Sequence, residues 1–512
     1  MNQSQLPSVL VVGAGIMGAG IAQVAAQAGR RVMLFDAREG AAAAARDKLG
    51  QTLQGLVAKG KLTGDAADAT LARIAPVARL EDAADAGLVV EAIVENLEAK
   101  RTLLLQLEAC VSPDAVLASN TSSISITALA NGLKAPGRVV GMHFFNPVPL
   151  MKLVEVVSGL QTDAAVAEQV FKLATSWGKT AVHTRSTPGF IVNRIARPYY
   201  AETLALLLER AAEPAVLDAC LRGAGFRMGP CELMDLIGHD TNFSVTESVY
   251  QANFYDKRFQ PSLVQREMVD GGLLGRKSGR GFFAYGDGVA APALPAARHG
   301  ALPATVRWHG AGQGGSAMAA FGQRWRDALS AAGVAVEQVM ASEWIGLESE
   351  GRRLALTDGR SATQRAADEA CAEMVVFDLP IAELPAGASL AYAGAASAHN
   401  AWLDQAAALL ACAGVQPQQL DDAPGLAVAR TVAMLINEAA DAVQQGVCNA
   451  EGADLAMKLG VNYPAGPFEW LARWDGAAVV ELIDQLDRFY RGERYRVSPW
   501  LRRRQPRPGS AR

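Results

Sequence analysis

The sequence is poor in the residues that build disulfide frameworks and metal sites. Its 512 residues include six cysteines and six histidines, and the cysteines lie far apart without any C-x-x-C spacing. This distribution excludes the usual zinc and redox motifs, and it favours reduced thiols in a cytoplasmic protein. We therefore expect no disulfide and no metal centre.

Long apolar runs and an excess of charge are also missing. The formal net charge is −4, and no apolar run is long enough to form a membrane-spanning helix. We therefore expect no membrane segment and no electrostatic attraction to nucleic acid. We interpret the basic run LRRRQPRPGSAR that ends the chain, residues 501–512, as a free tail.

The pattern of the remaining residues changes along the chain, which is too long for one hydrophobic core. Residues 1–187 alternate short β-branched apolar runs, from SVLVV to TAVHT, with alanine-rich segments. Continuously apolar runs are typical of parallel strands that helices cover on both faces. We predict an α/β Rossmann-type domain there. An all-α domain should follow over 188–285, where amphipathic Ala/Leu-rich segments replace the strands.

The same order returns in shorter form after a linker. Residues 286–304 are rich in Gly, Pro and Ala, which favours an irregular connection. Strand-like runs reappear over 305–420, where GAGQGG stands in place of GAGIMG, and helical segments reappear over 421–500. We predict a degenerate second copy of both domains, with a reduced α/β region and a non-catalytic helical repeat.

The clearest sign of repetition is a pair of helical segments. PGFIVNR begins at Pro188 and PGLAVAR begins at Pro424, and a G-P-x-E motif follows in each copy. Asn193 of the first copy is replaced by Ala429 in the second. The second copy therefore keeps the apolar helix and loses the amide side chain.

A glycine-rich loop follows the first apolar run. Gly13, Gly15 and Gly18 form a G-x-G-x-x-G motif, and the next apolar run ends in Asp36. Such glycines let the backbone approach a pyrophosphate, while the carboxylate accepts hydrogen bonds from ribose hydroxyls and repels a 2′-phosphate. This context predicts NAD rather than NADP, although Arg38 nearby would suit a 2′-phosphate. The alternative is an ordinary tight turn.

Two ionisable residues interrupt apolar runs in the segment MHFFNPVPLMKLVEVV. His143 stands at the carboxyl end of one run, and Glu155 lies between valines in the next. A buried carboxylate needs a partner, and it could orient an imidazole and stabilise its protonated form. A structural histidine and an edge-strand glutamate are the alternatives, which the spacing alone leaves open.

Several blocks, taken in order, resemble one enzyme family. Over about residues 8–285 the chain is similar to the L-3-hydroxyacyl-CoA dehydrogenase family, through GAGIMGAGIA, VVEAIVENLEAK, SNTSSI, HFFNPVPLMKLVEVV, TPGFIVNR and GPCELMDLIGHDT followed by GRKSGRGFF. The remaining half resembles the extended form of that family in bacterial phenylacetate catabolism, whose substrate is 3-hydroxyadipyl-CoA. The resemblance implies NAD-dependent oxidation of a (3S)-3-hydroxyacyl-CoA to the 3-oxoacyl-CoA.

The resemblance also implies roles for four residues. His143 would be the general base that takes the proton of the 3-hydroxyl group, and Glu155 would pair with it. Ser122, which closes SNTS, and Asn193 of FIVNR would hold the substrate oxygen. An alcohol proton is too weakly acidic to leave unaided, so a positioned base and hydrogen-bond donors are both needed.

Cofactor and coenzyme A contacts follow from the same resemblance. For Glu95 and Lys100 the alternative is a solvated helix face, and for Lys277 it is a cation that ends a helix. Lys59, in KGKL, falls where the family has a basic segment that meets the nucleotide phosphates of coenzyme A. The expected NAD contacts are Gly13, Ala14, Gly15, Ile16, Met17, Gly18, Asp36, Glu95, Lys100, Ser122, Asn146 and Lys277.

The second half lacks the motifs that carry chemistry. It has neither SNTS nor HFFNP, and the carboxylate nearest to the ribose position after GAGQGG, Glu337, comes four residues late. We expect it to bind no nucleotide and to form no second active centre. We instead expect its helical repeat to take the place that a partner subunit would occupy in a homo-oligomer.

Other functions would suit parts of this pattern. A short-chain 3-hydroxybutyryl-CoA dehydrogenase or a general β-oxidation enzyme would share the reaction. The β-hydroxyacid dehydrogenases also join a dinucleotide fold to helices, but they use a catalytic lysine. A catalytically silent NAD-binding structural protein is a further alternative, which the intact set of four residues argues against.

Overall fold

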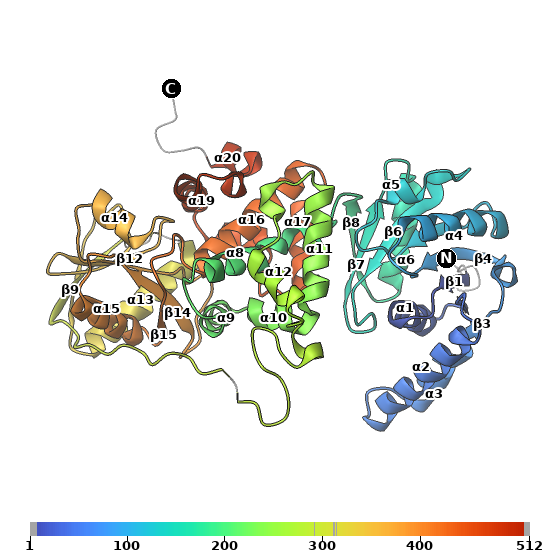
Figure 1. Ribbon diagram of the computed structural model, residues 1–512, viewed down its shortest axis with the longest axis horizontal. Helices are drawn as coiled ribbons and strands as arrows, with labels where there is room; N and C mark the ends of the chain where they lie inside the picture. Colours follow the sequence, from blue (N-terminus) through green and yellow to red (C-terminus); the bar gives the residue numbers. More distant parts are fainter. Residues whose placement is uncertain (1–7, 291, 311–312, 314, 506–512) are drawn as a thin grey trace. The chain divides into compact units, whose positions relative to one another are not determined.

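The computed structural model describes residues 8–290, 292–310, 313 and 315–505 (Figure 1). The described chain forms two compact units. One contains the residues up to Val192 together with Gly446–Val461, and the other contains Asn193–Gln445 and the residues from Asn462 onward. The units cut across the expected boundaries, because part of the second helical segment belongs to the first unit.

The first unit is built on an eight-stranded sheet with the order β3-β2-β1-β4-β5-β6-β7-β8. Neighbouring strands run parallel, except that β6 and β7 are antiparallel. The expected Rossmann-type sheet is confirmed. Only β3 is not predicted by the sequence, because three residues ending in proline carry no strand signal. The strands are β1 (Ser8–Val12), β2 (Val32–Phe35), β3 (Ile74–Pro76), β4 (Ala86–Glu91), β5 (Val116–Ser119), β6 (Val139–Phe144), β7 (Leu153–Ser158) and β8 (Thr180–Arg185).

Helices cover both faces of this sheet, which explains why its strands are continuously apolar. Val9 and Val11 belong to one core cluster, with side chains of α1, α2, α3 and α6, while Leu10 and Val12 belong to another, with side chains of α4 and α5. Successive residues of one strand thus serve opposite layers. The helices are α1 (Ile16–Gln27), α2 (Ala41–Ala58), α3 (Gly64–Ala72), α4 (Leu97–Cys110), α5 (Ile126–Leu129) and α6 (Ala164–Ser176).

One helix of the second helical segment completes the first unit. Helix α17 (Ala450–Gly460) packs against β7 and β8. The amide of Arg185 donates to the carbonyl oxygen of Val447 at 2.9 Å. A Cβ atom at Gly452 would come within 2.7 Å of Val182, so glycine permits the close approach of helix and strand.

The second unit has α8 and α16 at its centre. Residues 428–442 of α16 are buried on every side, since this helix packs against α8, α18, α19 and α20. Its helices, besides those on the second sheet, are α7 (Val192–Ile195), α8 (Arg197–Leu208), α9 (Pro214–Gly223), α10 (Pro230–Ile237), α11 (His239–Ala252), α12 (Leu263–Asp270), α16 (Val428–Gln444), α18 (Pro467–Arg473), α19 (Gly476–Tyr490) and α20 (Pro499–Arg504).

Buried ion pairs join the two helical copies reciprocally. Arg194 binds Glu438 at 2.6 Å, and Arg430 binds Glu202 at 2.6 Å. Arg430 and Glu438 occupy, in PGLAVAR and the helix that follows, the positions of Arg194 and Glu202 in the first copy. The arginine of each copy thus binds the glutamate of the other copy. Such reciprocal contacts are typical of an isologous dimer interface, in which two identical subunits use the same surface.

A second arginine on each glutamate repeats this symmetry. Glu438 also lies 3.3 Å from Arg258, and Glu202 lies 2.9 Å from Arg494. Arg258 belongs to the 3₁₀ turn Lys257–Phe259, and Arg494 belongs to the turn Glu493–Tyr495. Each central carboxylate is therefore buried and holds two guanidinium groups, of which only that of Arg494 is partly exposed.

The second sheet has seven strands in the order β10-β9-β11-β12-β13-β14-β15. It confirms the expected degenerate copy, although β11, β12 and β15 are not predicted. The first two form a hairpin around charged residues, and the segment QPQQ of β15 carries no apolar pattern. Its elements are β9 (Thr305–His309), α13 (Gly315–Ala331), β10 (Ala335–Gln338), β11 (Gly346–Ser349), β12 (Arg352–Leu356), α14 (Ala362–Asp368), β13 (Met374–Phe377), β14 (Ser389–Gly394), α15 (Asn400–Cys412) and β15 (Gln416–Gln419).

The second sheet receives a helix from the first helical copy. Helix α9 packs against β14, as α17 does against β7. The amide of Asp421, just after β15, donates to the carbonyl oxygen of Ala211 at 2.8 Å, which matches the bond between Arg185 and Val447. Each helical copy therefore covers the sheet of the other copy.

Some expected segments lie partly outside the described residues: 1–7 of the first domain, 291 of the linker, 311, 312 and 314 of GAGQGG, and 506–512 of the tail. The described linker residues have no helix or strand. The end of the linker is nevertheless anchored, because Arg298 donates to Asn400, Asp404 and Gln419 at 2.6 to 3.1 Å.

The expectation of a free basic tail from residue 501 is wrong for its first residues. Helix α20 begins after Ser498, whose hydroxyl accepts from the amide of Trp500, and Pro499 occupies its first turn. Leu501 is buried, and Arg502 pairs with Asp484. Ser498 and Pro499 are typical of the start of a helix, and this signal was overlooked because the residues that follow are mainly basic.

The described residues also bear on two expected absences. All six cysteines are free thiols. No helix within the described ranges is long and apolar enough to cross a membrane.

Removing the charge of Glu202 tests the energetic weight of the reciprocal pairs. We expect Glu202→Gln to lower the free energy of unfolding of the second unit by roughly 3–5 kcal/mol, because Arg430 and Arg494 would lose their shared buried anion. Urea unfolding followed by tryptophan fluorescence measures this loss. Glu209→Gln is the matched control, since the Glu209 side chain is 33% exposed and lies 3.7 Å from Arg430. Equal losses in both variants would contradict the prediction.

Candidate functional site

The glycine-rich loop between β1 and α1 is shaped by close contacts on one side and open space on the other. Gly13 has φ +101°, and a Cβ atom there would lie 2.6 Å from the carbonyl oxygen of Ala92. A Cβ atom on Gly18 would lie 1.7 Å from the carbonyl oxygen of Gly13, whereas one on Gly15 would meet nothing within 4 Å. Two glycines thus let the backbone pack, and Gly15 leaves room for a ligand at the helix N-terminus.

Asp36 stands directly after β2 and is tied to this loop. Its Oδ2 atom accepts from the amide of Ala14 at 2.9 Å, and Arg38 donates to both carboxylate oxygens at 3.1 and 3.2 Å. The hydrogen bond from Arg38, with smaller contributions from the two amides, lowers the pKa of Asp36 to about 2. Asp36 is therefore an anion at neutral pH, as recognition of ribose hydroxyls requires.

A hollow of about 540 Å³ lies beside the loop. Gly15, Ile16 and Asn146 line it, together with residues of α1, α2 and the segment after Asn146. Lys48 of α2 also lines this hollow. Lys59 lies past the end of α2, is exposed, and does not line it.

A buried carboxylate that the sequence interpretation missed organises the next part of the site. Glu91 ends β4 and is fully buried, and the ammonium group of Lys100 lies 2.8 and 3.0 Å from its two oxygens. Ser119 donates to Glu91, and Lys100 also lies 3.4 Å from Glu95. The Lys100 side chain is only 1% exposed, so it is not on a solvated helix face.

Glu95 draws the SNTS segment together. Its Oε1 atom accepts from the hydroxyl of Thr121 at 2.6 Å and from the amide of Ser122 at 2.9 Å. Burial opposes the ionisation of Glu95, but these hydrogen bonds and the charge of Lys100 outweigh it and lower its pKa. The Ser122 hydroxyl lies 3.3 Å from the same oxygen, so Lys100 orders Ser122 through Glu95.

His143 and Glu155 face each other across antiparallel strands. They are paired in register on β6 and β7, and His143 Nδ1 lies 2.6 Å from Glu155 Oε2. The other oxygen of Glu155 accepts from the amides of Ile191 and Val192 at 3.1 and 2.9 Å. Both side chains are buried. Because Nδ1 faces a carboxylate, we assign the proton to it, which leaves Nε2 as an acceptor.

The first unit thus contains Ser122, the paired His143 and Glu155, and the glycine-rich loop, and the second unit contains Asn193 and Lys277. Asn193 lies in α7 and is partly buried, between neighbours that are fully buried. Lys277 lies in the 3₁₀ turn Arg276–Ser278 and pairs with Asp240. That hydrogen bond lowers the pKa of Asp240.

Two further polar residues support the site. The Oδ1 atom of Asn120 accepts from the amide of Phe144 at 2.8 Å and thereby fixes SNTS to the end of β6. The hydroxyl of Thr121 accepts from the amide of Ile124 at 2.8 Å. Glu91, in LVVEA, carried the same signal as Glu155, an acid within a short apolar run, and could have been found from the sequence. The roles of Asn120 and Thr121 depend on loop geometry and could not have been found in this way.

The second copy replaces the His143 and Glu155 pair. The backbone amide of Asp378 donates to the carbonyl oxygen of Ala391, and Ala391 is paired in register with Gln418 on the next strand. In the first copy, His143 is paired with Glu155, and Glu155 is paired with Val182 on the next strand. Asp378 and Ala391 therefore occupy the positions of His143 and Glu155. The Asp378 carboxylate accepts from the amides of residues 427, 428 and 429. Burial raises the pKa of Asp378 to about 6, although these amides oppose the shift. The contact between sheet and helix survives, and the imidazole is lost.

No group of three or more His, Cys, Asp or Glu residues in the part of the chain that the structure describes could hold a metal ion.

Family models match most of the chain. The model of the NAD binding domain of 3-hydroxyacyl-CoA dehydrogenase matches residues 8–187. The C-terminal domain model of the same enzyme matches both 189–285 and 425–507. A model of the reduced Rossmann-fold domain of 3-hydroxybutyryl-CoA dehydrogenase matches 354–424. One model thus matches both helical segments.

Individual relatives agree with these models. A 3-hydroxyadipyl-CoA dehydrogenase of Escherichia coli is 43% identical over 97% of this chain and 97% of its own length. A probable 3-hydroxybutyryl-CoA dehydrogenase of Deinococcus radiodurans is 46% identical over 54% of this chain and 99% of its own length. The crystal structure of 3-hydroxybutyryl-CoA dehydrogenase from Escherichia coli K12 has a TM-score of 0.86 and 42% identity, and the match covers 98% of each chain.

Proposed function

Because the chain belongs to the 3-hydroxyacyl-CoA dehydrogenase family, we propose that His143 and Glu155 carry the proton transfer in its NAD-dependent oxidation of (3S)-3-hydroxyacyl-CoA to 3-oxoacyl-CoA. The contact of 2.6 Å between His143 Nδ1 and Glu155 Oε2 supports this assignment above all. It gives one imidazole nitrogen a fixed proton and leaves the other free to act as a base.

The proton of the 3-hydroxyl group passes to Nε2 of His143. Glu155 stabilises the imidazolium that results, and it stays in place because its second oxygen is held by the amides of Ile191 and Val192. Ser122 and Asn193 donate hydrogen bonds to the substrate oxygen and fix the carbon that reacts. Glu95 and Lys100 keep the Ser122 segment in position.

The residues present fit NAD. Gly15 offers open space at the N-terminus of α1, and the ionised carboxylate of Asp36 suits the ribose hydroxyls. The loop from Gly13 to Gly18, with Asp36 and Asn146, would hold the dinucleotide, and Lys277 is proposed as a further contact. When bound, the nicotinamide supplies the acceptor for the hydride that leaves C3. Lys59 is proposed as a contact of the coenzyme A phosphates.

The substrate we favour is 3-hydroxyadipyl-CoA in phenylacetate degradation. A relative bearing that name matches over 97% of both lengths, which includes the second half of this chain. The alternative is a short-chain 3-hydroxyacyl-CoA, because a solved relative that covers 98% of both chains is named for 3-hydroxybutyryl-CoA.

NADH oxidation with two substrates tests this choice. The proposal expects a higher kcat/KM with 3-oxoadipyl-CoA than with acetoacetyl-CoA. An equal or higher value with acetoacetyl-CoA would refute the dicarboxylyl substrate and leave the reaction class standing. Stoichiometric NADH binding without turnover of either substrate would instead indicate a silent NAD-binding protein.

Replacing the proposed base tests the mechanism. We expect His143→Gln to lower kcat by roughly 10²- to 10⁴-fold or more, since general base catalysis contributes about that much, while NADH still binds. Stopped-flow turnover and NADH fluorescence titration measure the two effects. His183→Gln is the matched control, because His183 lies on β8 with a half-exposed side chain that pairs with Glu168. Full turnover in the His143 variant would refute the assignment.

We propose that the second helical copy takes the place of a partner subunit. The reciprocal pairs Arg194–Glu438 and Arg430–Glu202 support this, because they have the symmetry of an interface between two identical subunits. The loss of the imidazole at Asp378 and of the amide at Ala429 supports a structural rather than catalytic role. The burial of α16 on every side is what such an interface requires.

Shortening the chain tests this role. A chain that ends at Arg298 would expose the faces of α8 and of β7 and β8 that the second copy covers. We expect it to aggregate, to self-associate or to unfold at a lower temperature. Size-exclusion chromatography with light scattering and thermal unfolding measure these outcomes. A shortened chain that stays monomeric and as stable and active as the full chain would contradict the proposal.

A further inference from the structure

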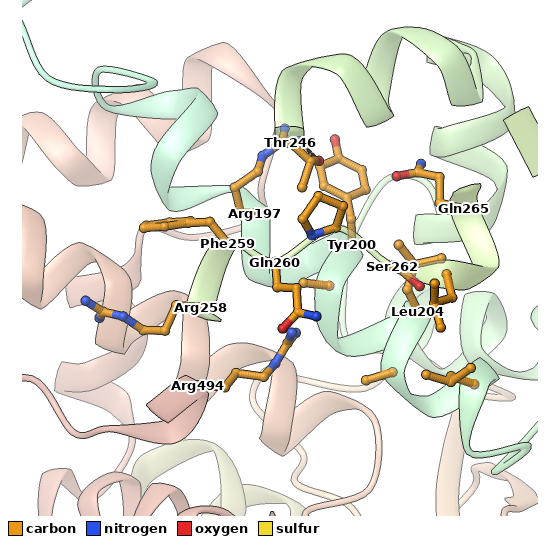
Figure 2. A pocket seen from close by; sticks show the side chains of 15 residues that line it. Arg197, Tyr200, Leu204, Thr246, Arg258, Phe259, Gln260, Ser262, Gln265 and Arg494 are labelled. Carbon is orange, nitrogen blue, oxygen red and sulfur yellow. Dashed lines mark hydrogen bonds between the residues drawn. The ribbon is translucent and has the colours of Figure 1, made fainter. Parts of the chain in front are cut away.

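The helical part of the second unit contains a cavity of about 230 Å³ that is lined by none of the catalytic or cofactor residues proposed above (Figure 2). One stripe of α8, residues 197, 200, 201, 204, 205 and 208, forms its wall. These positions recur at three- and four-residue intervals, so they share one helix face. Thr246 of α11, the segment Arg258–Gln265 and Arg494 complete the lining.

Three arginines line this cavity, and two of them are neutralised. Arg258 pairs with Asp441 and Glu438, and Figure 2 shows its guanidinium turned away from the other labelled side chains. Arg494 pairs with Glu202 at 2.9 Å. Arg197 is different. No carboxylate within the described ranges forms an ion pair with it.

Arg197 is nevertheless buried, with only 5% of its surface exposed. Its Nε atom donates to the carbonyl oxygen of Asn193 at 2.9 Å, and its Nη1 atom donates to the hydroxyl of Thr246 at 3.0 Å. The ring of Tyr200 lies 4.9 Å from the guanidinium carbon. Neutral partners thus fix the guanidinium, and Nη2 makes no hydrogen bond among the described residues. An unpaired buried cation is costly unless a ligand supplies the anion.

The second copy has no such arginine. In PGLAVARTVA the position that corresponds to Arg197 is Ala433, which is fully buried in α16. The second copy has also replaced the residues that correspond to His143, Glu155 and Asn193. The arginine therefore accompanies the copy that keeps the chemistry, and packing of this helix does not itself require it.

We infer that Arg197 binds the terminal carboxylate of a dicarboxylyl-CoA substrate and sets the preference for that class. The inference rests on the proposed function, in which Asn193 holds the oxygen on C3. Arg197 follows Asn193 by four residues, across the junction of α7 and α8, and its Nε atom donates to the Asn193 carbonyl oxygen at 2.9 Å, so its guanidinium lies beside that residue. In a six-carbon dicarboxylyl chain, C3 and the terminal carboxyl carbon are separated by three bonds, roughly 4 Å. The two contacts can therefore be made at once.

The neutral partners of Arg197 suit this task. Because Asn193 and Thr246 occupy Nε and Nη1, the remaining nitrogen meets the carboxylate end-on, as a charge-assisted hydrogen bond. Tyr200 excludes water from one face of the guanidinium, which strengthens its attraction to an anion. A terminal methyl group in place of the carboxylate would leave the cation unpaired.

The test compares two substrates of equal length in the full chain. Initial rates of NADH oxidation give kcat/KM for 3-oxoadipyl-CoA and for 3-oxohexanoyl-CoA, which has a methyl group in place of the terminal carboxylate. We expect the unsubstituted protein to favour 3-oxoadipyl-CoA. Arg197→Met should lower the ratio of the two kcat/KM values by roughly 10- to 100-fold, the range for a hydrogen bond to a charged group. Arg197→Lys should restore part of it.

Thr246→Val provides a second measurement if the Arg197 variants fail to bind NADH. It removes the hydroxyl that orients Nη1 and keeps the charge, so the ratio should fall by roughly 3- to 10-fold. An unchanged ratio of the two kcat/KM values in Arg197→Met overturns the inference. If the Arg197 variants do not bind NADH, an unchanged ratio in Thr246→Val overturns it instead. So does an unsubstituted protein that turns over 3-oxohexanoyl-CoA as well as 3-oxoadipyl-CoA. Failure with every 3-oxoacyl-CoA would instead refute the proposed function.

Discussion

The buried carboxylate of Glu155 connects the chemistry of this protein to its architecture. One oxygen holds the imidazole of His143, and the other holds the amides that begin the helical segment after β8. A fully buried carboxylate is tolerated only when both oxygens are satisfied, so the base and the start of the helices are positioned by the same group. A shift of Glu155 toward one of these partners would leave the other without its acceptor.

The second copy shows which half of that arrangement the fold requires. Asp378 stands at the position of His143 and accepts from the amides at the start of α16, while Ala391 stands at the position of Glu155. An acid still joins sheet to helix, but it now reaches across from the neighbouring strand. The architecture needs the acceptor, whereas only the first copy needs the base.

Exchange of helices explains why two copies remain in one chain. Helix α9 of the first copy covers β14, and α17 of the second copy covers β7 and β8. The central glutamates Glu202 and Glu438 each bind two arginines of the other helical copy, one near the start of that copy and one in a later turn. Neither helical copy buries these charges by itself, because each carboxylate and its closest arginine come from different copies.

Much of the fold and part of the site follow from the sequence. Continuous apolar runs identify seven strands of the first sheet, and the segment GxGxxG with Asp36 identifies the loop that meets NAD, because these signals are local in the chain. Lys100 could not be assigned in this way. A lysine in a helix is expected to have an exposed side chain. Its burial follows from the packing of the helix on the sheet, which brings the Lys100 ammonium group into contact with Glu91.

The sequence by itself determined the order of domains, the family and the residue types of the site. Tertiary structure decided what depends on contacts between distant segments. Only in the folded protein does α17 pack against the first sheet, and only there do the first residues of the basic C-terminus form α20. Folding also buries Arg197 at a place where no described acidic side chain pairs with it. Whether a buried charge has a partner of opposite charge depends on which distant residues come into contact after folding. The spacing of residues along the chain does not contain that information.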